Sequence, residues 1–457
     1  MRKFIQLMMI SCACLIVASC SREATIAGTA EKIRELALYT CSKGEITLLD
    51  TVKISSEDGS YQLVVELPYE GLYLIGRNEN ALYPIYLKNG ESLEACFQDN
   101  SMRIVGNSLS KENEILEKWE NGVKEVRLNG FLNRHLPGVS SAGYEIFFAQ
   151  LESAKKHQTA LLEELDANDG KFYTFMKNKV RAELDFYAMN FLRTEGMNIP
   201  DTVKLSEYYN NMGPDSIFVS RDILDLPYSG NMLETYVWYM NRENDFYQQK
   251  DFKSLAELFD DKDLQQSFLL SEASGMRYYD EYQKLIDGVG EDFFTSHYRE
   301  KMREIEEELA WSKPGIEAPD FKAMAPDSSW MHLSDYRGKV VVADVWATWC
   351  EPCRRMMPMF HQLHKEFDGQ NVAFLSICVG VWVEMDKWIE MSREFHIEKD
   401  NFFVNGWKSD FVKAYRVTGV PRYMIFDEQG RIVSVVAPNP TTPRLKEMIK
   451  SVLEQKD

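Results

Sequence analysis

Residues 340–346, with the sequence VVVADVW, form an almost continuous apolar run that ends just before Cys350 and Cys353. A run of this kind is typical of a strand buried on both faces of a sheet. The two cysteines then open a segment, extending to about Phe367, that we interpret as a helix. A buried strand that leads directly into a helix restricts this part of the chain to an α/β fold, with both sulfur atoms at the start of the helix.

Three interpretations of Cys350 and Cys353 are possible. A zinc site needs two more ligands, and His361 and His364 lie too far along the same helix to complete a tetrahedron. A purely structural disulfide between residues three apart closes a very small loop and constrains the unfolded chain little. In a redox pair, the helix N-terminus favours the thiolate of Cys350, and Cys353, more buried, attacks a mixed disulfide. We therefore predict a redox-active pair and no metal.

The chain divides into four parts by composition and pattern. We expect a signal peptide over 1–19, a β-sandwich-like domain over 20–108 and a helical region over 109–311. After a linker at 312–315, residues 314–457 alternate strands and helices around a mixed sheet. In this last part we predict strands at 340–346, 372–377, 422–426 and 432–436, and helices from the cysteines to about 367, at 385–395 and at 443–453.

Residues 314–457 resemble thioredoxin-like proteins, and more closely the TlpA/ResA-like thiol–disulfide oxidoreductases of bacterial envelopes. The upstream parts resemble the β domain and helical region that precede such modules in lipoproteins of Bacteroidetes-type bacteria. The matching motifs of the redox module are GIEAPDF at 315–321, Leu333 followed by GKVV at 338–341, WATWCEPC at 346–353, Pro358, and TGVP at 418–421. The resemblance implies an α/β thioredoxin-like C-terminal domain, preceded by a small β domain and a helical middle region.

The resemblance also implies catalytic roles. Cys350 would be the attacking thiolate, Cys353 the resolving thiol, and Asp344 the buried carboxyl that exchanges protons with the buried cysteine. A buried carboxyl has a raised pKa, which suits acid–base work near neutral pH. In one respect the chain departs from the ResA type, because Met356 stands where those relatives carry a glutamate. This departure weighs against a narrow role in cytochrome c maturation.

Five further residues are expected to form the substrate-binding surface. Pro421 matches the cis-proline whose loop pairs with the substrate backbone, and Val420 precedes it. Trp349, Glu351 and Pro352 would shape the surface beside the sulfur atoms. Glu351 is also expected to disfavour a thiolate on the neighbouring cysteine, an effect that Arg354 and Arg355 oppose. The resemblance implies no cofactor.

The first twenty residues predict export and a lipid anchor. Residues 1–19 contain two basic residues, an apolar stretch and a small-residue ending, as in a secretory signal. The ending VASC resembles a lipobox, so Cys20 would be lipidated and would anchor the chain to a membrane; an ordinary signal peptide with a chance cysteine is the alternative. Removal of 1–19 moves the formal net charge from −19 to −21, which disfavours nucleic-acid binding.

Compartment decides how the other cysteines are interpreted. In an oxidising envelope, Cys41 and Cys96 could form a disulfide or remain buried thiols, and both alternatives stay open. Cys378 is expected to be a buried bystander. A chain of this length does not depend on disulfides to fold.

We expect the protein to reduce disulfides of client proteins in the cell envelope, supplied with electrons by a membrane partner. The direction follows from the resemblance, since CxxC modules span reductants and oxidants. One rival is a client- or ligand-binding lipoprotein in which the redox domain is accessory. Another is a peroxidase, which the spacing of the cysteine motif disfavours.

Overall fold

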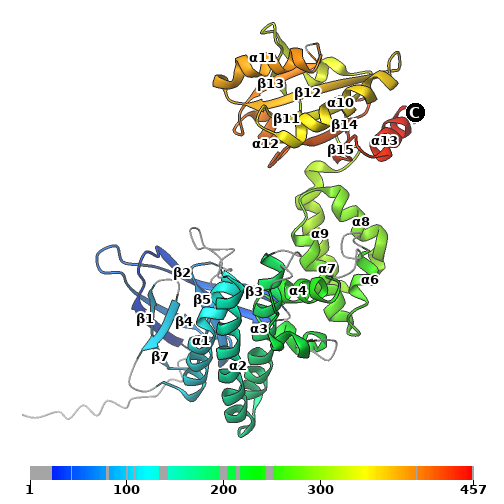
Figure 1. Cartoon of the computed structure of the whole chain (residues 1–457). Helices are drawn as coiled ribbons and strands as arrows, with labels where there is room; N and C mark the ends of the chain where they lie inside the picture. The colour runs from blue at the N-terminus through cyan, green and yellow to red at the C-terminus, as the bar shows by residue number, and fades with distance from the viewer. Residues whose placement is uncertain are drawn as a thin grey trace, which may run out of the picture. The chain divides into compact units, whose positions relative to one another are not determined.

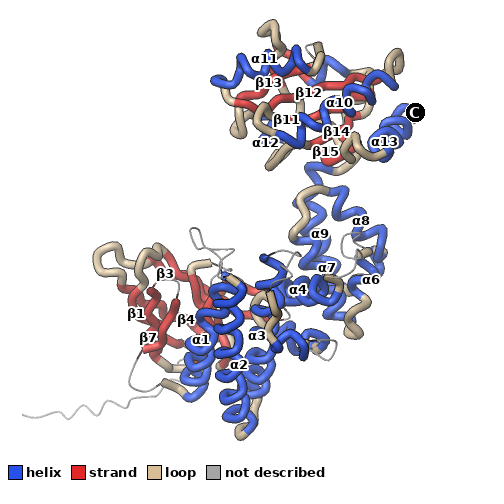
Figure 2. The backbone as a smooth tube through the Cα atoms, viewed as in Figure 1, coloured by secondary structure: helices blue, strands red, loops and turns tan. Residues whose placement is uncertain are grey.

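The computed structural model describes residues 23–42, 44–78, 82–98, 101–105, 109–132, 143–195, 203–212, 217–242, 251–397 and 399–454. The predicted signal peptide, residues 1–19, and the predicted lipidation site, Cys20, lie outside these residues. The chain divides into two compact units between Phe268 and Leu269. Figures 1 and 2 show the helices and strands of both units.

The first unit begins with two four-stranded sheets packed face to face. Their strand orders are β4-β1-β7-β8 and β3-β2-β5-β6. Apolar side chains from both sheets meet in one core, and alternate residues of β4 (Tyr61, Leu63 and Val65) point into it. The strands are β1 (Glu23–Thr29), β2 (Glu35–Ser42), β3 (Glu45–Lys53), β4 (Ser60–Glu66), β5 (Gly71–Gly76), β6 (Leu82–Leu87), β7 (Ser92–Gln98) and β8 (Ser101–Val105).

Residues 46–54 contain two short β-prone runs in sequence, at 46–49 and at 51–54. In the structure these runs belong to one strand, β3, which ends at Lys53. It pairs with β2 along its length, and the pairing continues past a register shift between Leu38 and Tyr39. Cys41 lies in β2 and Cys96 in β7, which belong to different sheets, and both are free thiols. The structure therefore favours the thiol alternative for these two cysteines.

Helices follow the sandwich, as the apolar spacing predicted. The first unit contains α1 (Lys111–Gly130), α2 (Tyr144–Asp166), α3 (Lys171–Glu195), α4 (Ser229–Met240) and α6 (Phe252–Ala256), with short 3-10 turns at Glu207–Asn211, Ile217–Val219 and Arg221–Asp225; α7 (Lys262–Ser274) spans the division between the units. Asn113 joins α1 to β6, because its side-chain amide exchanges two 2.8 Å hydrogen bonds with the backbone of Tyr86.

A buried ionic cluster also holds α1 and α3 together. Glu120 pairs with Arg127 at 2.5 Å and with Lys179 at 3.2 Å, and Lys179 also pairs with Glu183. Arg127 then donates to the Leu82 carbonyl of β6 at 2.7 Å. Because every buried charge in the cluster has a partner of opposite sign, the cluster ties the helices to the sheet without leaving a charge unpaired.

After the end of α7, the second unit continues with α8 (Tyr279–Val289) and α9 (Ser296–Leu309), which are followed by the 3-10 turn Ala310–Ser312. The sequence predicts both helices as part of the helical region 109–311. The structure instead includes them in the compact unit that contains the C-terminal sheet. Among the residues that the structure describes, no helix is both long enough and apolar enough to cross a bilayer.

The C-terminal sheet has seven strands in the order β10-β9-β13-β12-β11-β14-β15. They are β9 (Lys322–Met324), β10 (Trp330–His332), β11 (Val340–Trp346), β12 (Val372–Gly380), β13 (Asn401–Asn405), β14 (Arg422–Phe426) and β15 (Ile432–Ala437). The central strand β11 is parallel to β12 and antiparallel to β14, and β12 is parallel to β13. The sheet is therefore mixed, as predicted.

Helices cover both faces of this sheet. Side chains of α10 (Glu351–Glu366) and α13 (Pro443–Glu454) share a core with Val340 and Val342, and α12 (Asp410–Ala414) contributes to the core that holds Val341 and Val345. Further along, α11 (Met385–Glu394) packs beside the cysteines. All seven residues of β11 are buried, which explains its continuous apolar run.

Candidate active site

The two cysteines lie at the first turn of α10, directly after β11. Cys350 is the N-cap residue, and its sulfur accepts a hydrogen bond from the Cys353 backbone N–H at 3.2 Å. The two residues form a disulfide, with their Cα atoms 5.3 Å apart. Once the disulfide is reduced, the same N–H groups and the helix dipole stabilise a thiolate on Cys350, the position expected of the attacking sulfur.

The disulfide is nearly covered. Cys350 is 3% exposed and Cys353 1%, so the predicted difference in burial between them is small. The neighbouring residues of the motif are exposed to solvent. Trp349 is 56% exposed, and Glu351 and Pro352 are exposed as well. These three residues, which the sequence predicts to bind substrate, are therefore exposed beside the covered disulfide.

Asp344 lies in the middle of β11, 1% exposed. Because side chains alternate along a strand, it faces the same side of the sheet as Val342 and Trp346, and this is the side that α10 covers. Within the described part of the chain, neither of its carboxyl oxygens has a hydrogen-bond partner of good geometry. Burial raises the pKa of Asp344 to about 8, and the Tyr423 hydroxyl, opposite on β14, lowers it slightly.

The loop before β14 reaches the cysteines from another direction. The peptide bond between Val420 and Pro421 is cis, the geometry that the resemblance implies. Val420 packs against the apolar cluster that contains both cysteines. Residues 418–421 therefore border the disulfide, where a bound substrate backbone could pair with them.

Met356 occupies the position where the ResA-type relatives have a glutamate. Its side chain packs against the core beneath α10, and the Tyr423 hydroxyl donates to its sulfur at 3.8 Å. This position therefore supplies no acid. Asp344 is the buried carboxyl of β11, on the face of the sheet that α10 covers.

An exposed apolar patch lies beside the disulfide, formed by Trp349, Val381, Trp382, Val383 and Trp407, and of these residues the sequence indicated only Trp349. The rings of Trp349 and Trp407 lie 6.4 Å apart, and Val383 is 88% exposed. The patch could be inferred only from topology: β11, β12 and β13 are parallel, so the loops that follow them meet at one edge of the sheet.

One carboxylate ties two of these loops together. The Glu384 carboxylate accepts a hydrogen bond from the Thr348 hydroxyl at 2.9 Å and another from the Val381 backbone N–H at 3.0 Å. Thr348 lies two residues before the first cysteine, so the loop carrying Trp382 is attached directly to the cysteine motif. The patch therefore has a defined position relative to the disulfide.

The remaining candidates have no evident chemistry. Cys378 is opposite Trp346 in the sheet, and burial followed by the charge of Glu384 raises the pKa of its thiol, which keeps it unreactive. His361 and His364 are neighbours on α10, with ring centroids 6.3 Å apart. Among the described residues, no group of three or more His, Cys, Asp or Glu could hold a metal ion.

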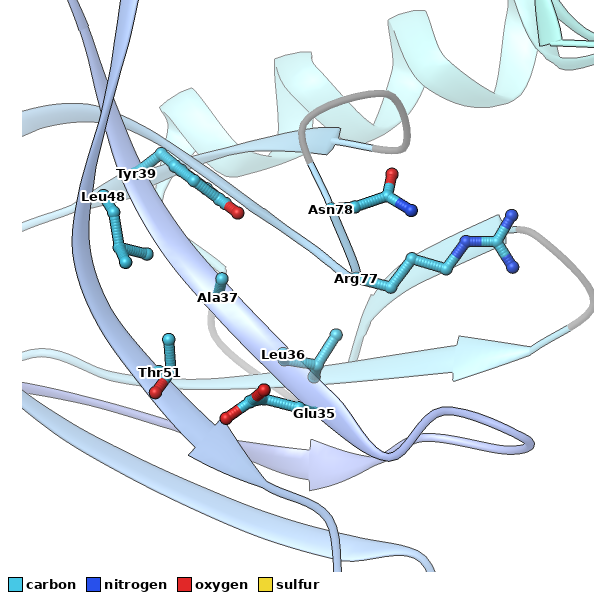
Figure 3. A pocket seen from close by; sticks show the side chains of 8 residues that line it. All are labelled: Glu35, Leu36, Ala37, Tyr39, Leu48, Thr51, Arg77 and Asn78. Carbon is cyan, nitrogen blue, oxygen red and sulfur yellow. The ribbon is translucent and has the colours of Figure 1, made fainter. Parts of the chain in front are cut away.

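The first unit has a hollow of its own on the sheet β3-β2-β5-β6. Its volume is about 360 Å³, and Figure 3 shows side chains of β2 and β3 beside it, with Arg77 and Asn78 just beyond the end of β5. Such a hollow leaves room for the rival interpretation, in which the upstream part binds a ligand. The lining residues are Glu35, Leu36, Ala37, Tyr39, Leu48, Thr51, Arg77 and Asn78.

A mixed sheet with a CxxC disulfide at the start of the helix after its central strand defines the class of thiol–disulfide oxidoreductases with a thioredoxin-like fold. The AhpC/TSA family model matches residues 314–435. The thiol-disulfide oxidoreductase ResA of Geobacillus thermodenitrificans is 29% identical over 140 residues, covering 30% of this chain and 77% of the relative. The thioredoxin-like protein YneN of Bacillus subtilis is 30% identical over 143 residues, covering 31% and 77%.

Among solved structures, a thiol:disulfide interchange protein from Bacteroides sp. matches 32% of this chain and 95% of its own, with 20% identity and a TM-score of 0.29. The chain belongs to the family of thioredoxin-like thiol–disulfide oxidoreductases by its similarity to YneN and ResA. The family model matches within the C-terminal unit, so the match does not extend to the sandwich or to α1–α4.

Proposed function

We propose that this protein reduces disulfides of client proteins in the bacterial cell envelope. The observation that carries the proposal is the disulfide at the N-terminus of α10, bordered by an exposed apolar patch. A small disulfide such as oxidised glutathione needs no apolar surface, whereas a polypeptide segment around a client disulfide would bury Trp349, Trp382 and Trp407. Protein clients are therefore the substrate class that best fits the site.

The proposed reaction begins with the dithiol form. The Cys350 thiolate attacks one sulfur of the client disulfide, so a mixed disulfide forms and the other client sulfur leaves as a thiolate. Cys353 then loses its proton and attacks the Cys350 sulfur, which expels the second client thiolate. Two electrons pass to the client, and the protein is left with the Cys350–Cys353 disulfide.

Asp344 is proposed to accept the proton that Cys353 loses and to return it when the disulfide is next reduced. Its pKa of about 8 supports this role, because a carboxyl with a pKa near the working pH can both accept and donate. The return to the dithiol needs two electrons, which we assign to a membrane dithiol donor. Anchoring through a lipid on Cys20, after removal of 1–19, would hold the protein beside that donor.

The reduction potential of the Cys350–Cys353 pair tests the proposal. The full mature chain is equilibrated with glutathione and dithiothreitol buffers, and the fraction of disulfide is read after thiol alkylation. We expect a potential near the thioredoxin value of about −270 mV, together with reduction of insulin disulfides. A potential near the DsbA value of about −120 mV would mean that the protein makes disulfides instead.

Two variants make this experiment specific. Cys353→Ser should accumulate a mixed disulfide with insulin, because the resolving sulfur is gone. Cys378→Ser is the matched control, since it removes a buried thiol that packs in the same cluster and should leave turnover unchanged. Peroxide consumption without insulin reduction would favour the peroxidase alternative.

A further inference from the structure

We propose that Arg277, Tyr278 and Trp311 are positioning residues that hold the loop 416–422 ready for client proteins. This inference rests on the proposed function, because the loop contains Pro421 and borders the disulfide. The three residues flank α8 and α9, the helices that precede the redox domain in sequence. They set the affinity for a polypeptide client and leave the thiol chemistry unchanged.

Contacts from these residues reach the loop at both ends and in the middle. The guanidinium of Arg416 lies over the Trp311 ring, 4.8 Å from its centroid, and that of Arg422 lies over the Tyr278 ring at 4.7 Å. Between them, Arg277 donates to the Thr418 hydroxyl at 3.1 Å.

The loop adopts a backbone conformation that needs such support. Arg416 has a backbone φ of +45°, which lies in the left-handed region that residues other than glycine rarely adopt. Its carbonyl accepts a hydrogen bond from the guanidinium of Arg422 at 3.2 Å, and Arg422 also donates to the Val435 carbonyl at 2.7 Å. The rings of Trp311 and Tyr278 lie against the same two arginines, so removing a ring frees one end of the loop.

The helical segment is itself fixed to the sheet, so it can act as a support. The Tyr279 backbone N–H donates to the Ser312 hydroxyl at 2.9 Å, which joins the start of α8 to the turn after α9. The Ser434 hydroxyl of β15 donates to the Asp280 carboxylate at 2.6 Å. Both ends of the α8–α9 pair are therefore attached near the point where they touch the loop.

Val420 connects this support to the reaction centre. It packs against the cluster of both cysteines on one side and against the core of the opposite sheet face on the other. Tyr278 and Trp311 pack against that second core. A loosened loop would therefore move the residue that borders the disulfide, while the sulfur atoms stay fixed by α10.

The test uses the full mature chain in its dithiol form. Trp311→Leu and Arg277→Ala are mixed with insulin or with oxidised glutathione, and free thiols are counted after acid quenching at each time. For insulin, we expect the half-saturating concentration to rise about five- to tenfold, with the limiting rate within about twofold of wild type. The rate with oxidised glutathione and the reduction potential should not change.

Two control variants match the substitutions. Trp330→Leu removes another ring that has a cation above it, because the Lys322 ammonium lies 4.9 Å from the ring centroid. Trp330 is in β10, at the edge of the sheet opposite to β15. Arg303→Ala removes an arginine of α9 that pairs with Glu307. An unchanged half-saturating concentration for insulin in the test variants would overturn the inference, as would equal losses with both substrates. Wild-type protein that exchanges with neither substrate would contradict the proposed function itself.

Discussion

At the scale of single residues, Asp344 is the group whose chemistry depends most on where the fold places it. A carboxyl in water has a pKa near 4, but this one is buried in a central strand with no strong hydrogen bond to its charged form. Ionising it in the folded protein is therefore costly. The cost places the pKa of the residue in the range that the proposed proton transfer needs and also makes the residue a source of instability.

Asp344→Asn should change how stability depends on pH. A pKa raised from about 4 in the unfolded chain to about 8 in the fold means that the unfolded state loses the proton first, so wild-type stability falls as pH rises through this range. Between pH 5 and pH 9 the disulfide form should lose roughly 4 kcal/mol from this group, and the Asn variant should lose almost none of it. Urea unfolding at several pH values measures the difference.

The same variant tests catalysis. Resolution of the mixed disulfide should slow in Asp344→Asn at neutral pH. In wild type the rate should change with pH around an apparent pKa near 8, and in the variant this pH dependence should be absent. Glu384→Gln is a suitable control, because that carboxyl supports a loop beside the disulfide without lying in β11. If the variant kept the wild-type pH–rate profile, Asp344 would have no part in proton transfer.

The residue scale is also where the sequence was most informative. Cys350 and Cys353 could be assigned from the apolar run before them and the helix after them, and the cis bond before Pro421 matches the motif that suggested it. The near-complete burial of Cys350 could not be predicted. It results from packing with Trp388 and Phe403, which come from elements far along the chain.

At the scale of elements, strand direction assembles the surface around the disulfide. The parallel strands β11, β12 and β13 end at one edge of the sheet, so their loops carry Trp349, Trp382 and Trp407 to the same place. The CxxC motif marks the loop of Trp349, whereas the loops of Trp382 and Trp407 contain no motif that marks them as a binding surface. The patch therefore had to be found in the structure.

Removal of the patch should weaken binding of protein clients. Trp382→Ser combined with Trp407→Ser should raise the half-saturating insulin concentration about tenfold or more, since buried aromatic residues dominate binding energy at interfaces. Exchange with oxidised glutathione should stay within about twofold, because a small disulfide buries little of the two rings and neither ring takes part in the exchange itself. Trp330→Ser, an exposed tryptophan on the edge strand β10, is the control. Unchanged insulin kinetics would show that clients bind elsewhere.

Short elements were the ones that sequence patterns could not detect. The edge strands β9 and β10 have three residues each, too few to establish a period of two. β13 begins and ends with asparagine, a residue depleted in strands, and is held in place by pairing with β12. Longer elements with a buried face, such as β11 and α13, were predicted to within one or two residues.

At the scale of the whole molecule, the redox unit is larger than the matched family segment. Residues 312–315 read as a linker because they contain Pro-Gly. In the structure, however, Ser312 is buried, and the Gly315 backbone N–H donates to the Ile432 carbonyl of β15 at 2.7 Å. The segment continues the packing of the sheet, so α8 and α9 belong with the domain that follows them.

This division leads to a prediction about the role of the first unit. Residues 269–457 form a compact unit and should keep the reduction potential and the glutathione exchange rate of the whole chain, because every contact described around the disulfide lies within them. A chain cut at 314 instead loses Tyr278 and Trp311 from the core and should unfold at lower temperature.

Insulin kinetics of residues 269–457 then separate the two functional hypotheses. If the redox unit alone recognises clients, it should match the whole mature chain in half-saturating concentration. If the first unit captures clients, for example through the hollow beside Arg77, the shorter chain should need at least about tenfold more insulin at an unchanged limiting rate. Arg77→Ala in the full chain should then cause part of the same loss. A lower limiting rate with glutathione as well would mean that the two units share the reaction itself.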